Sequence, residues 1–168
     1  MADAQILVAV NGTIAQIKVA GRATHAVSKG LKDFALELGS LKIENVFIDL
    51  AECTGMDSTF MGVLTQIGLP MFKADTPVLI LNASDSNVKL LTDLGLSKIF
   101  LFDSNVGEFN WLALKQLSTK KLSNQEKGEM MLESHEILSD IDDANVPKFK
   151  DVIAFLKDDL ETYKEKKD

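Results

Sequence analysis

Over roughly the first 115 residues, short apolar runs alternate with stretches in which apolar residues recur at helical spacing. Runs typical of strands lie at residues 6–10, 15–19, 46–50, 78–81 and 99–102. Asn11-Gly12, between the first two runs, predicts a tight hairpin. Each later run is followed by a helical stretch. A hairpin followed by strand–helix units predicts an α/β fold with a mixed β-sheet that is parallel through its later strands and covered by helices.

The helical stretches carry start and stop signals. Apolar residues recur at helical spacing from Val27 to Leu38, and Gly39 follows as a C-terminal stop. Three further helices are predicted: from Ser58 to near Pro70, from the cap Ser84 to Gly95, and over residues 109–117.

The C-terminal part of the chain has a purely helical pattern. Ser123 and Glu126 have the spacing of a capping box, and an apolar stripe that includes Ser134 and Leu138 follows them. Pro147 stands where a second amphipathic helix begins. About five residues separate the two helices, which predicts an antiparallel helical hairpin. Its stripes need a covering surface, which is the first part of the same chain, a second copy in a homodimer, or a helix of another partner.

Composition divides the chain at a similar place. The net charge of −7 splits into twelve acidic against nine basic residues before residue 116 and thirteen against nine in the 53 residues that follow. Nine of the ten glycines lie in the first part. We therefore predict a domain at residues 1–117 and a helical extension at residues 118–168.

The charge balance also excludes classes of partner. An acidic chain with only one arginine, Arg22, is unsuited to binding nucleic acid or anionic lipid. No apolar stretch is long enough to cross a membrane. A single cysteine, Cys53, fits a reducing compartment. These features predict a cytoplasmic protein.

The most distinctive strand–helix junction follows the run at residues 46–50. Asp57 or Ser58 is placed to cap the next helix, with a hydroxyl facing unpaired backbone N–H groups at the positive end of the helix dipole. Such a position suits a phosphate group. The segment reads Asp57-Ser58-Thr59-Phe60-Met61-Gly62-Val63.

In this place the segment resembles the motif of STAS domains, and most closely that of the bacterial anti-sigma factor antagonists. Asp57, Ser58 and Thr59 match it, as do Gly62 and Val63. Met61 replaces the usual Leu, and Phe60 departs from the usual Gly. The resemblance covers roughly residues 1–117 and implies nothing about the extension.

The resemblance implies a regulatory binding protein. Ser58 would be phosphorylated by a serine kinase that is also an anti-sigma factor, with Thr59 as a secondary hydroxyl. The unmodified chain would sequester this kinase, the phosphorylated chain would release it, and a PP2C-type phosphatase would reset the switch. The partner-binding residues would be Asp57, Ser58, Thr59, Phe60 and Met61.

Two other interpretations stay open. Ser58 serves only as a helix cap in the first, where the chain is a constitutive STAS-like scaffold or a small-ligand-binding subunit of another signalling, transport or stress assembly. In the second, the bulky Phe60 narrows access to the hydroxyl or contacts a different partner.

The remaining candidates for chemistry are weaker, and we expect no enzyme, no metal and no cofactor. His25 and His135 are far apart in sequence, so Ser58 is expected to lack the base of a nucleophilic serine. Cys53 is predicted to be a buried, small apolar residue. The acidic residues from Asp140 to Asp143 lack the turn glycine of a calcium loop.

Overall fold

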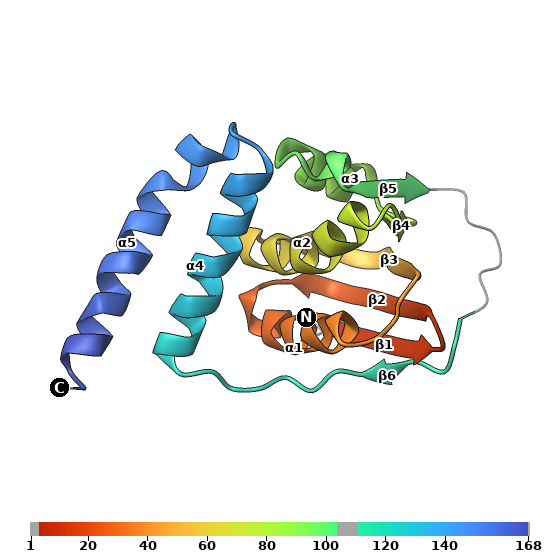
Figure 1. Ribbon diagram of the computed structural model, residues 1–168, viewed down its shortest axis with the longest axis horizontal. Helices are drawn as coiled ribbons and strands as arrows, with labels where there is room; N and C mark the ends of the chain where they lie inside the picture. The colour runs from red at the N-terminus through yellow and green to blue at the C-terminus, as the bar shows by residue number, and fades with distance from the viewer. Residues whose placement is uncertain (1–3, 104–110, 168) are drawn as a thin grey trace.

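The computed structural model describes residues 4–103 and 111–167, which form one six-stranded mixed sheet and the helices that pack on it (Figure 1). The strands are β1 (Gln5–Asn11), β2 (Ile14–Ala23), β3 (Asn45–Met56), β4 (Val78–Leu81), β5 (Phe100–Asp103) and β6 (Lys115–Gln116). The helices are α1 (His25–Gly39), α2 (Ser58–Lys73), α3 (Asp85–Asp93), the short 3₁₀ helix η1 (Leu96–Lys98), α4 (Asn124–Ile141) and α5 (Asn145–Glu165).

The strand order in the sheet is β5-β4-β3-β2-β1-β6. β1 and β2 form the predicted antiparallel hairpin, which turns at Gly12 with φ of 60°. From β2 to β5 all pairings are parallel. The predicted α/β fold, with a mixed sheet parallel through its later strands, is confirmed. The parallel strands all end at the edge of the sheet where α1, α2 and α3 begin.

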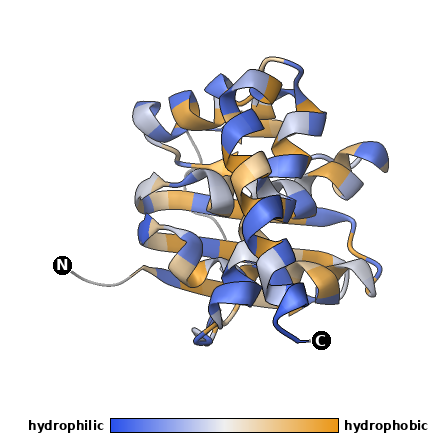
Figure 2. Ribbon diagram, turned by 90° about the vertical axis from the view of Figure 1, so that its left-hand side faces the viewer, coloured by the Kyte–Doolittle hydropathy of each residue, from blue (hydrophilic) through white to orange (hydrophobic). Residues whose placement is uncertain are grey.

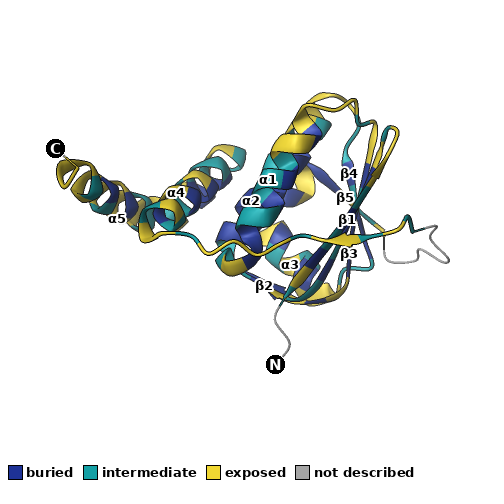
Figure 3. Ribbon diagram, turned by 90° about the horizontal axis from the view of Figure 1, so that it is seen from below, coloured by how far each residue is buried: buried dark blue, intermediate teal, exposed yellow. Residues whose placement is uncertain are grey.

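The main core lies between the sheet and one layer of helices. Figure 3 shows α1, α2 and α3 on the same side of the sheet. Alternate residues of each strand face this layer because successive side chains of a strand point to opposite faces. The fully buried side chains there include Ile17, Leu31, Ile48, Leu64 and Ile80.

Two predicted elements differ from the structure. The strand expected to end at residue 50 continues as β3 to Met56, because β2 extends to Ala23 and pairs with it through two register shifts. The helix predicted at residues 109–117 is wrong in its described part. Lys115–Gln116 is instead strand β6, and Leu117 N donates to Ile6 O at 2.8 Å. The open edge of β1 offers backbone groups that need partners, and this pairing outweighs the helical spacing. Residues 109 and 110 lie outside the described residues.

The two predicted C-terminal helices are present and lie antiparallel, side by side (Figure 1). We call residues 124–165 the C-terminal hairpin. The capping box of Ser123 and Glu126 starts α4 as predicted. Helix α4 packs on α2, and α5 packs on α4, farther from the sheet. Figure 2 looks onto this hairpin and shows hydrophilic stretches on its helices, with the hydrophobic strands behind.

The turn between α4 and α5 is attached to the sheet domain near α3. Asn145 is fully buried, and its Nδ2 donates to Leu94 O and Leu138 O at 2.8 Å each. Lys98 Nζ donates to Asp142 Oδ2 at 2.9 Å. The hairpin is therefore held at its turn as well as along α4.

Within residues 4–103 and 111–167, no helix has the length and apolarity needed to span a lipid bilayer.

Candidate functional site

Asp57 joins the beginnings of two helices. It is the N-cap of α2, and its Oδ1 accepts a hydrogen bond from Phe60 N at 2.8 Å. Its other oxygen, Oδ2, accepts from His25 N at 2.8 Å at the start of α1, and His25 Nδ1 lies 3.6 Å away. The carboxylate thus meets unpaired N–H groups of both helices, where the helix dipoles favour negative charge. This brace fixes the backbone on which Ser58 stands.

Ser58 is the first residue of α2, and it is partly exposed. Its Oγ lies 2.8 Å from His135 Nε2 of α4. The other ring nitrogen of His135, Nδ1, lies 2.5 Å from Met131 O. Because a carbonyl oxygen only accepts, Nδ1 carries the hydrogen in the neutral ring and Nε2 presents a lone pair. Ser58 is therefore the donor to His135.

The expectation that Ser58 lacks a nearby base is wrong, because α4 brings His135 to it across 77 positions of sequence. A serine hydroxyl that is hydrogen-bonded to an imidazole is the arrangement of an activated nucleophile. Here a main-chain carbonyl orients the ring in place of the usual carboxylate.

Helix α4 approaches α2 most closely one turn beyond Ser58. A Cβ placed on Gly62 would lie 2.5 Å from Ser134 Cβ and 2.7 Å from Ser134 O. Ser134 is fully buried, and its Oγ has no hydrogen-bond partner among the described residues. On the other side of α4, the ring of Phe149 meets the imidazole of His135 edge-on, with ring centroids 4.9 Å apart. His135 is thus held by close packing, whereas Ser58 stays partly exposed.

The other three predicted site residues lie in the interior. Phe60 is fully buried, and Thr59 and Met61 are only 4% and 5% exposed. The Phe60 ring occupies the core beneath the junction. Of the five residues predicted to contact a partner, Asp57 and Ser58 are the ones that this conformation leaves partly exposed.

Comparison with known proteins identifies the family of this chain. The family model of the STAS domain matches residues 5–109, well over half of the chain. The chain belongs to the STAS domain family. The match includes the whole segment from Asp57 to Val63 and stops before the C-terminal hairpin.

One solved structure shares the fold of this STAS domain, and two further structures are similar to the chain. The anti-sigma factor antagonist SpoIIAA in its unphosphorylated form matches with a TM-score of 0.50 and 13% identity, over 61% of this chain and 89% of its own. The phosphorylated form of SpoIIAA, described as a Bacillus cell fate determinant, has a TM-score of 0.49 and 15% identity, over 60% of this chain and 92% of its own. A putative anti-sigma factor antagonist from Thermotoga maritima has a TM-score of 0.49 and 11% identity, over 56% and 82%. No curated protein matches the sequence.

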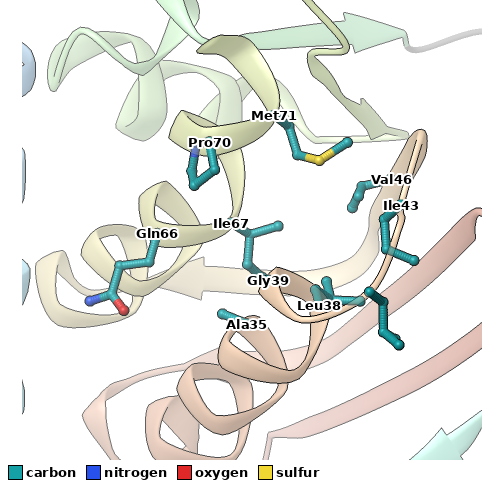
Figure 4. A pocket seen from close by; sticks show the side chains of 10 residues that line it. Ala35, Leu38, Gly39, Ile43, Val46, Gln66, Ile67, Pro70 and Met71 are labelled. Atoms are coloured by element: carbon teal, nitrogen blue, oxygen red, sulfur yellow. The ribbon is translucent and has the colours of Figure 1, made fainter. Parts of the chain in front are cut away.

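A second feature of the STAS domain is an apolar cleft near the far end of α2 (Figure 4). Its volume is about 190 Å³, and Leu38 of α1, Ile43, Val46 of β3, and Ile67 and Met71 of α2 line it. Ser58 and Met71 are thirteen residues apart in one helix, or about 20 Å along its axis. The cleft and the Ser58 junction are therefore separate places on the molecule.

Cys53 takes no part in either place. Its side chain is buried, as predicted, and burial raises the pKa of its thiol. Its carbonyl accepts from Asn87 Nδ2 at 2.8 Å. Over the part of the chain that the structure describes, no three His, Cys, Asp or Glu side chains come together as metal ligands.

Sequence reasoning missed the contribution of α4 to the site. His135 and Ser134 are polar residues within the apolar stripe of that helix, and both are buried. A buried polar residue in such a stripe needs a partner, which is the signal that could have pointed to Ser58. The partner itself could not be chosen before the docking of α4 on α2 was known.

Proposed function

We propose that this STAS domain is a regulatory binding protein of the anti-sigma factor antagonist type, and that it acts by binding and not by catalysis. In its unphosphorylated form it sequesters an anti-sigma serine kinase, and phosphorylation of Ser58 releases the kinase. The observation that carries the proposal is the place of Ser58: a partly exposed hydroxyl at the first position of α2, directly after β3 and beside the Asp57 brace.

The charge of a phosphate is large enough for such a switch. Phosphorylation adds about −1.5 to −2 charges at neutral pH. Each unit facing an acidic group about 4 Å away costs about 1 kcal/mol in water and about 4 kcal/mol at an effective dielectric of 20. Since about 1.4 kcal/mol is tenfold in affinity, a phosphate near Asp57 and an acidic partner surface weakens binding by about two to three orders of magnitude. No refolding of the STAS domain is needed.

The remaining parts of the proposal concern partners. A PP2C-type phosphatase removes the phosphate, Thr59 is a secondary acceptor, and Asp57 helps to dock the kinase. Phe60 and Met61 are buried, so they act by shaping the start of α2. Thr59 is buried as well, so it becomes an acceptor only when the start of α2 opens. A homodimer through the C-terminal hairpin stays a prediction.

Intact-mass spectrometry of the natively purified protein tests the modification directly. We expect one added phosphate that maps to Ser58. Pull-downs from the native cell then compare wild type, Ser58→Ala and Ser58→Glu, of which the first two are expected to recover a serine kinase and the third to recover little. If neither wild type nor Ser58→Ala captures a kinase, the proposal fails.

The apolar cleft supports a second candidate function, that of a small-ligand-binding subunit or constitutive scaffold. A cleft of about 190 Å³ that is lined mainly by apolar side chains suits a small apolar ligand. In that case Ser58 is only part of the helix start, and Ser58→Glu leaves the recovered complexes unchanged. Native mass spectrometry then shows an added small-molecule mass that is lost in Ile67→Trp, a substitution that fills the cleft.

A further inference from the structure

The C-terminal hairpin lies on the surface through which a protein partner would reach Ser58. Helix α4 crosses the N-terminal half of α2, and its His135 holds Ser58 Oγ at 2.8 Å. We propose that α4 is an internal competitor for this surface: a docked α4 and a phosphate on Ser58 exclude each other, so that phosphorylation undocks the hairpin. This inference rests on the proposed function in taking Ser58 as the phosphorylated residue.

The space between α2 and α4 near Ser58 is too small for a phosphate that points toward α4. Ser58 and Gly62 lie four residues apart in α2, so they share one face of the helix. At Gly62 that face is so close to α4 that even one methyl group would fall 2.5 Å from Ser134 Cβ and 2.7 Å from Ser134 Cα. A phosphate is far larger than a methyl group, and it would sit one helical turn away. Ser58 Oγ and His135 Nε2 are only 2.8 Å apart, so a phosphate that points toward α4 displaces that helix.

Phosphorylation also removes the donor of the hydrogen bond between Ser58 and His135. Ser58 now donates its hydroxyl hydrogen to the lone pair of His135 Nε2. A phosphoserine has no hydroxyl hydrogen, and its phosphate oxygens act as strong acceptors at neutral pH. The present bond to Nε2 is then lost, because Ser58 no longer has a hydrogen to donate. The His135 ring is held by Met131 O at 2.5 Å and by Phe149, so it is not free to turn away.

The C-terminal hairpin can undock from the sheet domain as a unit. Met130 of α4 and Leu156 and Leu160 of α5 are buried, yet they lie outside the main core cluster of the sheet domain. The fully buried α4 residue that joins that core is Leu138. Residues 117–123, which form neither helix nor strand, connect the hairpin to the domain. Undocking therefore opens a packed interface without dismantling the sheet.

The covalent step itself takes place in the undocked state. A nucleoside triphosphate bound to the kinase donates its γ-phosphoryl group: the bond from Ser58 Oγ to phosphorus forms, and the bond from phosphorus to the nucleoside diphosphate oxygen breaks. The hydroxyl proton of Ser58 leaves to solvent. In the unmodified protein, the kinase binds only the fraction of molecules whose hairpin is undocked, and its apparent affinity falls by that fraction.

Hydrogen–deuterium exchange on the full chain tests this without any kinase, because phosphoserine can be incorporated at position 58 during translation. We expect the α4 and α5 amides to exchange about tenfold faster or more in the phosphoserine protein than in wild type, with α1 and β3 unchanged. Ser58→Ala is the matched control, since it removes the donor and adds no bulk. One neutral hydrogen bond corresponds to about a two- to thirteenfold change, so the phosphoserine protein is expected to exchange faster than Ser58→Ala.

Two results would overturn the inference. Unchanged or slower exchange in α4 would mean that the phosphate is accommodated, for example by a protonated His135. Faster exchange that extends equally to α1 and β3 would mean that the phosphate destabilises the whole fold. If the phosphoserine protein does not fold, Ser58→Glu takes its place with the same criteria.

The inference and the proposed function can fail separately. Absence of any phosphate on the natively purified chain counts against the proposed function, whereas the exchange experiment still reports whether a phosphate and a docked α4 exclude each other. Because docking of α4 and phosphorylation of Ser58 oppose each other, a substitution that undocks α4 is expected to favour phosphorylation. Leu138→Ala is therefore expected to raise the phosphorylated fraction of Ser58 in the native cell, and a lowered fraction would contradict the competition.

Discussion

The sheet domain and the C-terminal hairpin are held together by different forces. In the domain, α1 and α2 cover the sheet with mainly apolar contacts such as Leu31, Leu64 and Ile48, each fully buried. The buried hydroxyls of Ser28 and Thr65 bond to the backbone of their own helices. Where α4 meets α2, by contrast, the buried side chains include Ser134 and His135. Burial of apolar area stabilises the first region, whereas close approach and a few polar partners stabilise the second.

This difference suggests why one region can move while the other stays folded. Apolar area removed from water contributes about 25 cal/mol per Å² and accumulates over the whole sheet. A polar contact contributes only about 1 kcal/mol net, and it is lost when one partner changes chemically. A contact made through His135 or Asn145 is thus more sensitive to a single modification than one made through leucines.

The largest expected effect compares one leucine from each region. Leu138→Ala and Leu31→Ala both empty a fully buried site and are expected to cost about 2–5 kcal/mol. In Leu138→Ala we expect this loss in the opening of the hairpin, and in Leu31→Ala in the unfolding of the domain. Urea unfolding followed by residue-resolved hydrogen exchange separates the two. Identical exchange patterns in both variants would show that the two regions unfold as one unit.

Two glycines of α2 sharpen the comparison. A Cβ on Gly62 would strike Ser134 of α4, and a Cβ on Gly68 would lie 2.5 Å from Phe100 Cε1 of β5. Each change to Ala is expected to cost about 1–3 kcal/mol, Gly62→Ala by loosening the hairpin and Gly68→Ala by straining the sheet domain. Gly39→Ala, which would meet nothing within 4 Å, is the control and should be neutral or slightly stabilising. Thermal unfolding ranks the stabilities of the three variants, and hydrogen exchange shows in which region each loss of stability occurs.

Removing the attachment at the turn between α4 and α5 is expected to cost a similar or somewhat smaller free energy. Asn145→Ala removes the donors to Leu94 O and Leu138 O and is expected to cost about 1–3 kcal/mol of hairpin docking. Asn124→Ala, at an exposed position of α4, serves as the control. Limited proteolysis within residues 117–123 measures the docking, with faster cleavage expected in Asn145→Ala alone. Equal cleavage rates in both variants would mean that the turn adds nothing to docking.

The smallest expected effect comes from acid. Hydrogen bonds from Ser123 hold the pKa of the exposed Glu126 below its ordinary value of 4.5, and those from Lys98 and Ala144 hold the pKa of Asp142 below 3.8. Because both pKa values are lowered in the folded state, the stabilisation is complete above pH 4.5 and is lost as the pH falls through the lowered values. We expect the hairpin to loosen below about pH 4 before the sheet domain does.

Circular dichroism and exchange between pH 5 and pH 3 follow this loss. Asp142→Asn, which keeps the shape of the side chain but cannot ionise, is expected to flatten the part of the pH dependence that belongs to the turn. An unchanged profile in that variant would assign the acid effect to other groups.

Much of the fold was predictable because local patterns decide it. The apolar run at residues 78–81 and the Asn11-Gly12 turn each specify their own element, and β4 and the β1–β2 hairpin form where expected. Ser123 and Glu126 likewise satisfy each other at the start of α4. Strand β6 was missed because its conformation depends on the free edge of β1, a partner more than a hundred residues away in sequence.

By itself, the sequence determined the alternation of strands and helices, the family motif at Asp57 and Ser58, and the presence of two C-terminal helices. These follow from short-range spacing, in which each residue constrains its near neighbours. Only the tertiary structure decided that His135 meets Ser58, because their contact depends on the angle and depth at which α4 docks on α2. A glycine at position 62 permits that depth, and no pattern within either helix specifies the pairing.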